Sequence, residues 1–328
     1  MNESLSDLGE LEILNRLKKF MDVGQIDDDT ALLESENKDL LINTDVLVEN
    51  VHFKDSIGTS KDIGWKAITT NLSDLASSGA KGSTSFTVGL IAPPTTKWHW
   101  LEGVYEGMQK ALNEFGGKLI GGDCSKGKEK ILSITAISSI GPLKLHRSNA
   151  LPGDCLITSG PHGLSKLGLL LLNSKKANFF ETIIPSSLKA TAINHHLRPY
   201  PPIQSLRKLE VCKPNYLPWR AAGTDSSDGL IEAISGICRS SHCQAVLNKT
   251  TLPRPPKWPE GAEWDDWCLF GGEDYELVIS LPEEWADEWL KLVPSAYKIG
   301  FMQKGIPKVI WENGKEVIGL KENYFRHF

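Results

Sequence analysis

The alternation of hydrophobic and polar positions along the chain predicts a repeating series of strands and helices. Leucines recur every three residues over residues 5–17, close to the helical period, and predict an opening helix. Residues 39–53 are rich in β-branched and apolar side chains and predict a strand interrupted by Asp45. The next block, residues 60–80, predicts a helix that ends at Gly79.

The helix expected over residues 60–80 carries a polar face. Ser60 is its expected N-terminal cap, and Asn71 and Asp74 lie one turn apart, so their side chains share one face. The remaining expected elements are strands over residues 85–94, 118–127, 131–141 and 155–160, helices over 100–115 and 164–173, a helix ending at 195–202, a loop and helix over 223–238, a strand within 267–282 and a hairpin over 311–317.

The pattern restarts near residues 145–154, where the sequence reads "LHRSNALPGD". Because 328 residues are enough for two domains of ordinary size, we expect two α/β halves, residues 1–145 and residues 146–328. The proline-rich stretch at residues 199–202 is expected to be a loop rather than the boundary.

Composition and charge narrow the classes of function. The chain is 40% hydrophobic and 23% charged, which is typical of a globular protein. The net charge of -5 and the pI near 5.9 offer no basic stripe for a nucleic-acid backbone, so nucleic acid is not an expected partner. A polyanionic ligand would need local groups or metal ions to balance its charge.

The cysteines and the hydropathy profile indicate a reducing, aqueous compartment. No CxxC pair occurs, and Cys238 and Cys243 beside His242 lack the second pair that a structural zinc site needs, so reduced thiols are expected. The first residues are acidic and amphipathic rather than signal-like, and no segment has about 18 consecutive apolar residues, so we expect a cytoplasmic protein without a membrane partner. The six cysteines are Cys124, Cys155, Cys212, Cys238, Cys243 and Cys268.

Aspartates recur where loops meet regular elements, next to Ser, Thr, Asn or Gly. Each one alone has an ordinary explanation as a cap or turn. Together they provide the oxygen ligands that magnesium takes when it shares itself with substrate phosphates, so they predict metal-dependent phosphate chemistry. No P-loop, dinucleotide fingerprint or protein-kinase motif is present, and the metals would therefore carry most of the charge of ATP. These residues are Asp29, Asp45, Asp74, Asp123 (on an expected turn at Gly121 and Gly122), Asp225 and Asp228.

The order and spacing of these motifs resemble the thiamine-monophosphate kinase family, part of a superfamily with aminoimidazole ribonucleotide synthetase and selenophosphate synthetase. The segments that carry the resemblance are "DDTALL", "INTDVLVENVHF", "NLSDLASSGA", "LIGGDCSKG", "RSNALPGD", "HHLRP", "DSSDGL" and "GGEDYEL". The resemblance implies an α/β (α+β), two-domain aminoimidazole ribonucleotide synthetase-like fold. Its N-terminal domain, residues 1–145, would bind ATP and Mg²⁺ and form a homodimer through its β-sheet. Its C-terminal α/β domain, residues 146–328, would complete the nucleotide and substrate site.

The resemblance also implies the reaction and the residues that serve it. ATP would phosphorylate thiamine monophosphate to thiamine diphosphate by direct in-line transfer of the γ-phosphoryl group, assisted by several Mg²⁺ ions and without a covalent nucleophile. The family's metal ligands fall on Asp29, Asp45, Asp74, Asp123 and Asp225, with Asp228 as a further ligand and oxygens from Asn43 and Thr44, and its ATP contacts fall on Gly122, Asp123, Arg147 and Ser227.

The substrate contacts implied by the resemblance are His52, Asp74, Glu273 and an aromatic residue near the C-terminus, Phe325 or Tyr324. Thiamine carries a cationic thiazolium ring, which suits an aromatic wall with a nearby acid, and Glu273 is the expected acid. Three tryptophans in the second half are expected to be packing residues rather than ligand walls: Trp258, Trp264 and Trp267.

The aspartate run "GQIDDDTALL" departs from the family pattern. In the family, a glycine usually stands directly before the paired aspartates. Here the pair is Asp28 and Asp29, and Ile26 and Asp27 intervene after Gly24 and Gln25. Asp29 aligns with the metal ligand, Asp28 is expected to support it, and Asp27 is the added acid, expected to be solvated. The geometry of this loop is therefore the feature for which the family pattern is the weakest guide to this chain.

Other departures concern the details of substrate contact and leave every core carboxylate in place. Cys124 replaces a usual threonine, and Thr224 and Ser226 stand where apolar residues are common.

Another ATP-dependent enzyme of the superfamily is the alternative, either a ribonucleotide amide cyclo-ligase or a selenophosphate synthetase. The latter normally needs an early reactive cysteine, whereas the first cysteine here is Cys124. A non-catalytic protein that binds a nucleotide or thiamine phosphate is the alternative from a different class.

Overall fold

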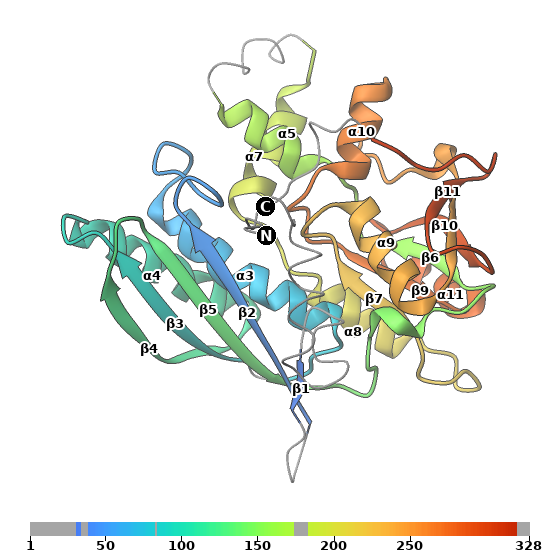
Figure 1. The fold of residues 1–328 in the computed structure, drawn as a ribbon, viewed down its shortest axis with the longest axis horizontal. Coiled ribbons are helices and arrows are strands. Elements are labelled where there is room, and N and C mark those ends of the chain that lie inside the picture. Colours follow the sequence, from blue (N-terminus) through green and yellow to red (C-terminus); the bar gives the residue numbers. More distant parts are fainter. Residues whose placement is uncertain (1–30, 34–38, 83, 174–182, 320–328) are drawn as a thin grey trace, which may run out of the picture.

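The computed structural model describes residues 31–33, 39–82, 84–173 and 183–319. Its elements form two β-sheets with helices packed on them (Figure 1). The mixed α/β fold expected from the sequence is therefore confirmed. The opening helix predicted over residues 5–17 lies outside the described residues.

The first sheet is built from the N-terminal half in the order β1-β2-β5-β3-β4. All neighbours are antiparallel except β3 and β4, which are parallel. The strands are β1 (Ala31–Leu33), β2 (Leu40–Val48), β3 (Ser85–Ala92), β4 (Lys118–Lys126) and β5 (Ile131–Ser139).

One face of the first sheet is covered by α3 (Ser60–Ser77) and α4 (Trp98–Phe115), which lie behind it in Figure 1. Alternate residues such as Leu47, Val88 and Ile134 point into this interface and form a core. No described helix covers the opposite face, where Val46 is 44% exposed. Among the described residues, the sheet is thus buried on one face and open on the other, which its alternating burial pattern reflects.

The start of α3 differs by one residue from the prediction. The cap is Thr59 and not Ser60, since the Thr59 side chain accepts a hydrogen bond from the Asp62 amide. The Asp62 carboxylate in turn accepts one from the Thr59 amide at 2.8 Å, which completes a capping box. The sequence contained this Thr-x-x-Asp signal one residue before the residue chosen as the cap.

Glycines allow α3 and α4 to pack against each other with their backbones in contact. A Cβ atom at Gly107 would lie 1.9 Å from the carbonyl oxygen of Lys61, and one at Gly64 would lie 1.8 Å from that of Val104. Real Cβ atoms do not approach so closely, so any larger residue would force the two helices apart.

The second sheet is built from the C-terminal half in the order β11-β8-β10-β6-β9-β7. Its strands are β6 (Cys155–Thr158), β7 (Ala222–Asp225), β8 (Gln244–Leu247), β9 (Leu277–Leu281), β10 (Tyr297–Gln303) and β11 (Val309–Trp311). Its helices are α5 (Leu164–Leu172), α7 (Ser186–Leu197), α8 (Ile203–Val211), α9 (Leu230–Ser241), α10 (Ala262–Phe270) and α11 (Glu283–Leu292), with the short 3-10 helices η2 (Arg147–Asn149) and η3 (Lys249–Thr251).

Two predictions for the second half need correction. The segment before Asp225 was expected to be a loop, but Ala222–Asp225 forms strand β7, whose four residues are all buried. Helices α8, α10 and α11 and strands β8 and β10 were not predicted; α8 follows directly on the proline-rich segment. The hairpin turn at the Asn-Gly pair is present, since the Trp311 amide donates to the Lys315 carbonyl at 2.8 Å.

The glycine pair in "LIGGDC" also differs from its prediction. Gly121 and Gly122 lie within the edge strand β4 and do not form a turn. A Cβ atom at Gly122 would stand 2.1 Å from the carbonyl oxygen of Val88 on the neighbouring strand. The glycine is therefore required by the approach of β4 to β3, whatever else it contacts.

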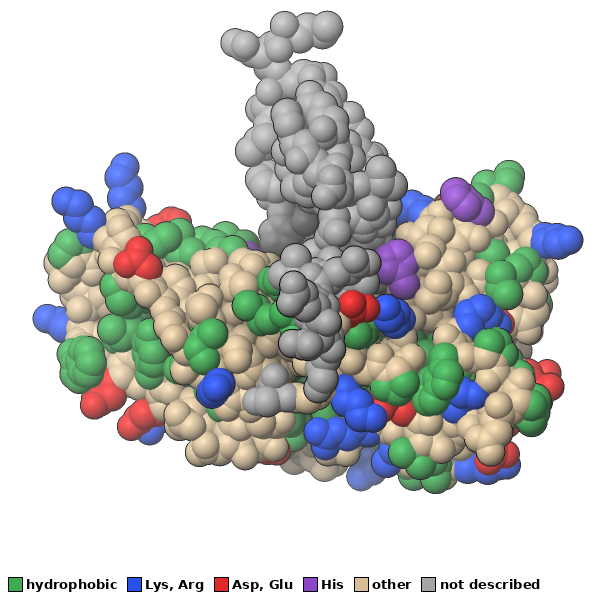
Figure 2. Space-filling view, turned by 90° about the horizontal axis from the view of Figure 1, so that it is seen from below, with side chains coloured by type: hydrophobic (Ala, Val, Ile, Leu, Met, Phe, Trp, Pro, Cys, Tyr) green, Lys and Arg blue, Asp and Glu red, His purple; other side chains and the backbone are tan. Residues whose placement is uncertain are grey.

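The two halves meet along α3. Trp65 donates its indole N–H to the Pro199 carbonyl at 2.9 Å, and Arg198 pairs with Asp62 at 2.5 Å. From below, apolar side chains are scattered over both halves, and basic side chains are interspersed with acidic ones (Figure 2). Among the helices that the structure describes, none is both long and apolar enough to cross a membrane.

We predict that Gly107→Ala lowers the free energy of unfolding by about 1–3 kcal/mol, because the added methyl group cannot fit between α3 and α4. Urea denaturation followed by circular dichroism measures this change. Gly236→Ala is the matched helical control, since a Cβ there would lie 3.6 Å from its nearest neighbour. Equal losses for the two variants would contradict the packing argument.

Candidate functional site

Acidic side chains from three elements come together where the two halves meet. Asn43 on β2 donates to Asp74 on α3 at 2.8 Å and to Asn71 at 3.2 Å. Ser73 on α3 donates to Asp225 at the end of β7 at 2.7 Å. The one-turn spacing of Asn71 and Asp74 thus produces the shared face predicted from the sequence.

Tyr275 is a residue on which the charges of this acidic region act. Its side chain is buried, and burial is the first cause that raises its pKa well above the ordinary value. Nearby carboxylates raise it further, because a negative phenolate would be repelled by their charge. These carboxylates are Glu273, Asp45, Asp225 and Asp74.

The loop after β7 holds Asp225 and Ser227 in a fixed arrangement. Both the amide and the hydroxyl of Ser227 donate to Asp225, at 3.3 and 3.0 Å. Gly229, with φ +100°, then begins α9, and Asp228 between them is exposed. The loop therefore presents polar groups at the start of a helix, where the helix dipole favours anionic ligands.

The donor chemistry of this region fits magnesium. All of its side chains offer oxygen, and the buried Oδ1 atom of Asn43 has no hydrogen-bond partner among the described residues. Within the part of the chain that the structure describes, no three His, Cys, Asp or Glu side chains form a compact metal-binding group. Magnesium does not require such a group, because it usually takes one or two carboxylates and completes its shell with water and phosphate oxygens.

Asp123 and the Thr44 side chain lie elsewhere. Asp123 pairs with Gly89 in the ladder, so its exposed side chain is on the uncovered face of the sheet. Thr44 is on the same face, where its hydroxyl meets Thr135 at 2.8 Å. Asp45 and Gly122 share one row of the sheet but are separated by two strands, or roughly 14 Å. Among the described residues, one chain therefore keeps Asp123 apart from Asn43 and Asp45, which lie on the opposite face of the sheet.

Arg147 stands beside the Asp225 loop. Its guanidinium donates from Nε and Nη2 to the Thr224 hydroxyl at 3.1 and 3.0 Å. Thr224 replaces a residue that is usually apolar in the family, and the structure gives the substitution a partner. The other departure, Ser226, likewise accepts a hydrogen bond from the Glu276 amide at 3.0 Å.

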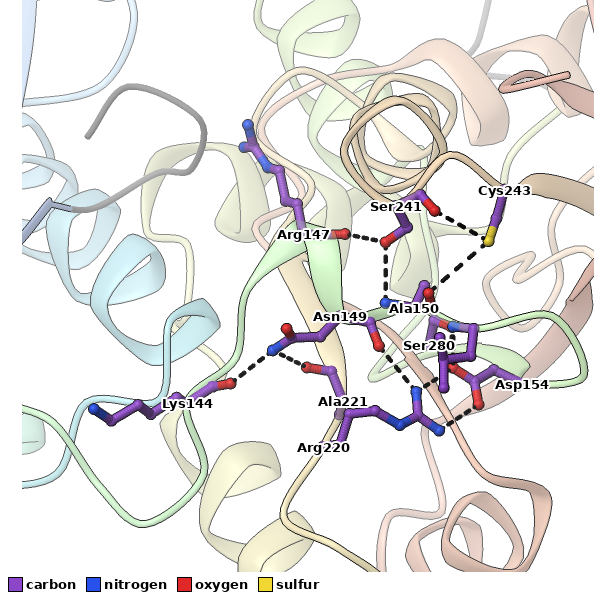
Figure 3. A network of polar contacts seen from close by, with 11 residues as sticks. Lys144, Arg147, Asn149, Ala150, Asp154, Arg220, Ala221, Ser241, Cys243 and Ser280 are labelled. Atoms are coloured by element: carbon purple, nitrogen blue, oxygen red, sulfur yellow. Dashed lines mark hydrogen bonds and ion pairs between the residues drawn. The ribbon is translucent and has the colours of Figure 1, made fainter. Parts of the chain in front are cut away.

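A network of polar contacts holds the segment that carries Arg147 (Figure 3). Ser241 donates to the Arg147 carbonyl at 2.6 Å. Arg220 donates hydrogen bonds from two nitrogens to the buried Asp154 carboxylate, at 2.7 and 2.8 Å, and also donates to the Asn149 carbonyl. The Arg147 side chain points away from this network. The segment is therefore fixed while the guanidinium is directed elsewhere.

A small cavity of about 30 Å³ brings His52 together with residues that the sequence did not single out. It lies between the end of β2, α3 and α7. His52 accepts a hydrogen bond from the Val48 amide at its Nδ1 atom, 3.1 Å away. The cavity is lined by Leu47, His52, Phe53, Ile57, Asp62, Ile63, Lys66, His196 and Leu197.

Glu273 adjoins this cavity through two of its lining residues. One carboxylate oxygen lies 2.6 Å from Lys66 Nζ, and the other lies 3.3 Å from His196 Nδ1. Burial alone would raise the pKa of Glu273, but Lys66 and then His196 outweigh it, so the pKa is lowered well below its usual range. His52 and Glu273, both predicted substrate contacts, are therefore neighbours of one cavity.

A buried polar cluster supports the segment that contains Glu273. Asp274 is fully buried, and its carboxylate accepts hydrogen bonds from the amides of Gly163 and Ser165 at the start of α5. Glu276 accepts one from Ser159. Burial raises the pKa of Glu276 to about 7.

Several of these residues were not expected from the sequence. Lys66 is the one charged residue in the stretch from Ile63 to Ser73, which was an available signal. His196 lies in the quoted "HHLRP" segment but had no assigned role. Trp258, Trp264 and Trp267 pack against each other edge to face, as the packing interpretation predicted. Three predicted site residues, Asp29, Tyr324 and Phe325, lie outside the described residues.

Comparison with known proteins places this site in context. The family described as AIR synthase related protein, N-terminal domain, matches residues 27–140. The thiamine-monophosphate kinase of Prochlorococcus marinus is 57% identical, over 99% of this chain and 98% of that protein. The thiamine-monophosphate kinase of Synechococcus elongatus is 35% identical, over 100% and 98%.

Solved structures agree with the sequence comparison. A structure described as AaThiL complexed with AMPPCP and TMP superimposes with a TM-score of 0.86 and 28% identity, covering all of both chains. The hydrogenase maturation protein HypE in complex with ATP gives a TM-score of 0.66 at 20% identity, over 97% of this chain and 95% of that one, which shows a shared fold alone.

We predict that Glu276→Gln makes the protein relatively more stable at high pH. Because the folded state binds the Glu276 proton more tightly than the unfolded chain, whose usual value is 4.5, its stabilising effect is complete below about pH 4.5 and is lost as the pH rises to about 7. The variant should gain about 2 kcal/mol over the wild type between pH 5 and pH 8. Urea denaturation at several pH values measures this, with Glu102→Gln as the exposed control; a constant difference would contradict it.

Proposed function

Since this chain belongs to the thiamine-monophosphate kinase family, we propose that it transfers the γ-phosphoryl group of ATP to thiamine monophosphate, with several Mg²⁺ ions, in a homodimer. The observation that carries this proposal is the meeting of Asp74, Asp225 and Arg147 with the Glu273 cavity at one junction between the two halves. The related structure described with AMPPCP and TMP holds an ATP analogue and TMP, which supports the same pair of ligands here.

The reaction joins two phosphates and needs charge neutralisation more than a protein nucleophile. An oxygen of the substrate phosphate forms a bond to the γ-phosphorus, the bond from that phosphorus to the β–γ bridging oxygen breaks, and ADP leaves. A phosphate oxygen is already a competent nucleophile, so no general base is assigned. The protein has to hold both groups in line and balance their charge.

The carboxylates at the junction are the proposed Mg²⁺ ligands. The charges of Asp45, Asp74 and Asp225 all act on Tyr275, and the proposed set adds Asp29, Asp228 and an oxygen of Asn43. The Thr44 hydroxyl, also a proposed ligand, lies on the opposite face of the sheet with Asp123. When held by these residues, Mg²⁺ would neutralise the negative charge of the phosphates. Arg147 is proposed to add a fixed positive charge at the nucleotide, and Ser227 a hydroxyl and an amide.

The residues that line the cavity beside Glu273 are proposed to form one wall of the site for the thiamine rings, since the cavity itself, at about 30 Å³, is far smaller than the two rings. Thiamine is cationic, and the Glu273 carboxylate is held as an anion next to His52 and the apolar side chains of Leu47 and Phe53. Asp74 would face the phosphate end of the same substrate. An aromatic side chain at Phe325 or Tyr324 would complete the wall.

Asp123 and Gly122 are proposed to reach the site from a second copy of the chain. Both lie on edge strand β4, and the side chain of Asp123 is on the face opposite to α3. That face is uncovered by any described helix and carries Val46, Thr135 and Gly89, which are small or apolar. A homodimer through this sheet would bring Asp123 of one chain to the carboxylates of the other.

We predict that the protein forms thiamine diphosphate from thiamine monophosphate and ATP, and that removing Mg²⁺ with EDTA abolishes the product. Asp74→Asn and Asp225→Asn should each lower kcat by about 100-fold or more, because each removes a charge that balances phosphate. Chromatography of the fluorescent thiochrome derivatives measures the product. Asp287→Asn, on the distant helix α11, is the control.

Turnover of a ribonucleotide amide in place of thiamine monophosphate would favour the alternative enzyme. Binding of ATP and thiamine monophosphate without any product would favour a binding protein. Unchanged activity in EDTA or in both aspartate variants would contradict the metal-assisted mechanism.

We predict that inactive variants restore each other if the site spans two chains. Asp123→Asn and Asp225→Asn chains, mixed after denaturation and refolded together, should form heterodimers in which one of the two sites is intact. Random pairing makes half of the dimers heterodimers, so roughly a quarter of wild-type activity should return. A mixture that stays as inactive as its parents would place Asp123 and Asp225 in the same chain's site.

A further inference from the structure

Lys66 is a buried lysine on the polar face of α3. Its side chain is 6% exposed, and its ammonium group lies 2.6 Å from Glu273. Placing an ammonium group away from water is costly unless an anion pairs with it. The ion pair also crosses between the halves, because Lys66 belongs to the first half and Glu273 to the second.

The backbone of Glu273 is already constrained before its side chain is considered. Its φ is +67°, an uncommon conformation for a residue with a side chain. Its amide donates to the Ser227 carbonyl at 2.7 Å, and a Cβ atom at Gly272 would lie 2.7 Å from that same oxygen. The segment that contains Gly272 and Glu273 therefore packs closely against the loop that follows Asp225. The direction of the Glu273 carboxylate then depends on the groups that its two oxygens contact.

Only one of the two contacts of the Glu273 carboxylate supplies a full positive charge at neutral pH. His196, the contact of Oε2, has a pKa lowered chiefly by burial, and its Nδ1 atom also lies 2.9 Å from the Ser165 hydroxyl. Lys66, the contact of Oε1, is therefore the cation that balances Glu273. Without it, the Glu273 side chain, which is 28% exposed, would lose the contact that fixes the position of Oε1.

The cavity gives this ion pair a place in the reaction. Lys66 and His196 both line it, together with His52. We propose that Lys66 is a positioning residue for thiamine monophosphate, fixing the direction in which the Glu273 carboxylate faces the cationic rings of the substrate. The inference rests on the proposed function and adds to it a residue that acts through Glu273 rather than on the substrate.

A double-mutant cycle tests this role. Lys66→Met, Lys66→Arg, Glu273→Gln and the double variant Lys66→Met/Glu273→Gln are compared by steady-state kinetics, varying thiamine monophosphate and ATP separately. Calorimetry with thiamine monophosphate and a non-hydrolysable ATP analogue measures binding directly. Lys61→Met is the matched control, since Lys61 lies on the same helix and its side chain is 58% exposed.

Lys66→Met is expected to raise KM for thiamine monophosphate about 10-fold or more while KM for ATP changes less than about 3-fold. Lys66→Arg should restore most of the loss, because it keeps the charge. The double variant should be no worse than Glu273→Gln alone, because Lys66 has no effect once its partner is gone.

Other outcomes would overturn the inference. If the losses of the two single variants multiply in the double variant, Lys66 acts independently of Glu273, as a direct phosphate contact would. Equal rises in both KM values with a lower unfolding midpoint, not restored by Lys66→Arg, would leave Lys66 a structural role only. A wild-type protein that makes no thiamine diphosphate would instead refute the proposed function, and this inference with it.

Discussion

Helix α3 is buried and yet carries many polar side chains, and the rest of the structure depends on how these are paired. Buried polar groups cost free energy unless they are hydrogen-bonded. Several partners come from the other half of the chain: Lys66 pairs with Glu273 and Ser73 with Asp225. Each half therefore satisfies polar groups of the other, which makes the junction a part of the folded core as well as the place where ligands are proposed to bind.

The same junction concentrates negative charge. Asp45, Asp74 and Asp225 are close enough to Tyr275 to shift its pKa, and their mutual repulsion opposes folding. Cations bound there would relieve this repulsion, so ligand binding and stability are coupled through one set of side chains. Glu273 differs, because its own lysine already balances its charge.

Local patterns in the sequence predicted most elements of the N-terminal half and fewer of the C-terminal half, and they predicted contacts between distant elements poorly. The alternation in β2 and the spacing of Asn71 and Asp74 follow from backbone geometry, and the structure has both. The pairing of Lys66 with Glu273 joins residues far apart in the chain, and periodicity carries no information about it.

Strand order was equally beyond the sequence. Asp123 follows a glycine pair typical of a turn, yet those glycines lie within an edge strand because β3 approaches so closely. Its separation from Asp45 depends on the order β2-β5-β3-β4, which neighbouring residues do not specify. Family resemblance named the proposed site residues, but only the fold shows which of them one chain can bring together.

The rigidity of α3 has a consequence for the shape of substrate that the junction can accept. Lys66 and Asp74 are eight residues apart on one helix, which corresponds to a rise of about 12 Å. The geometry of the helix fixes this separation, and backbone contact with α4 at Gly64 and Gly107 leaves α3 little room to shift. In the proposed function, this separation sets the distance between the part of the site that binds the rings and the part that binds the phosphate. A substrate is therefore selected by its length as well as by its chemical groups.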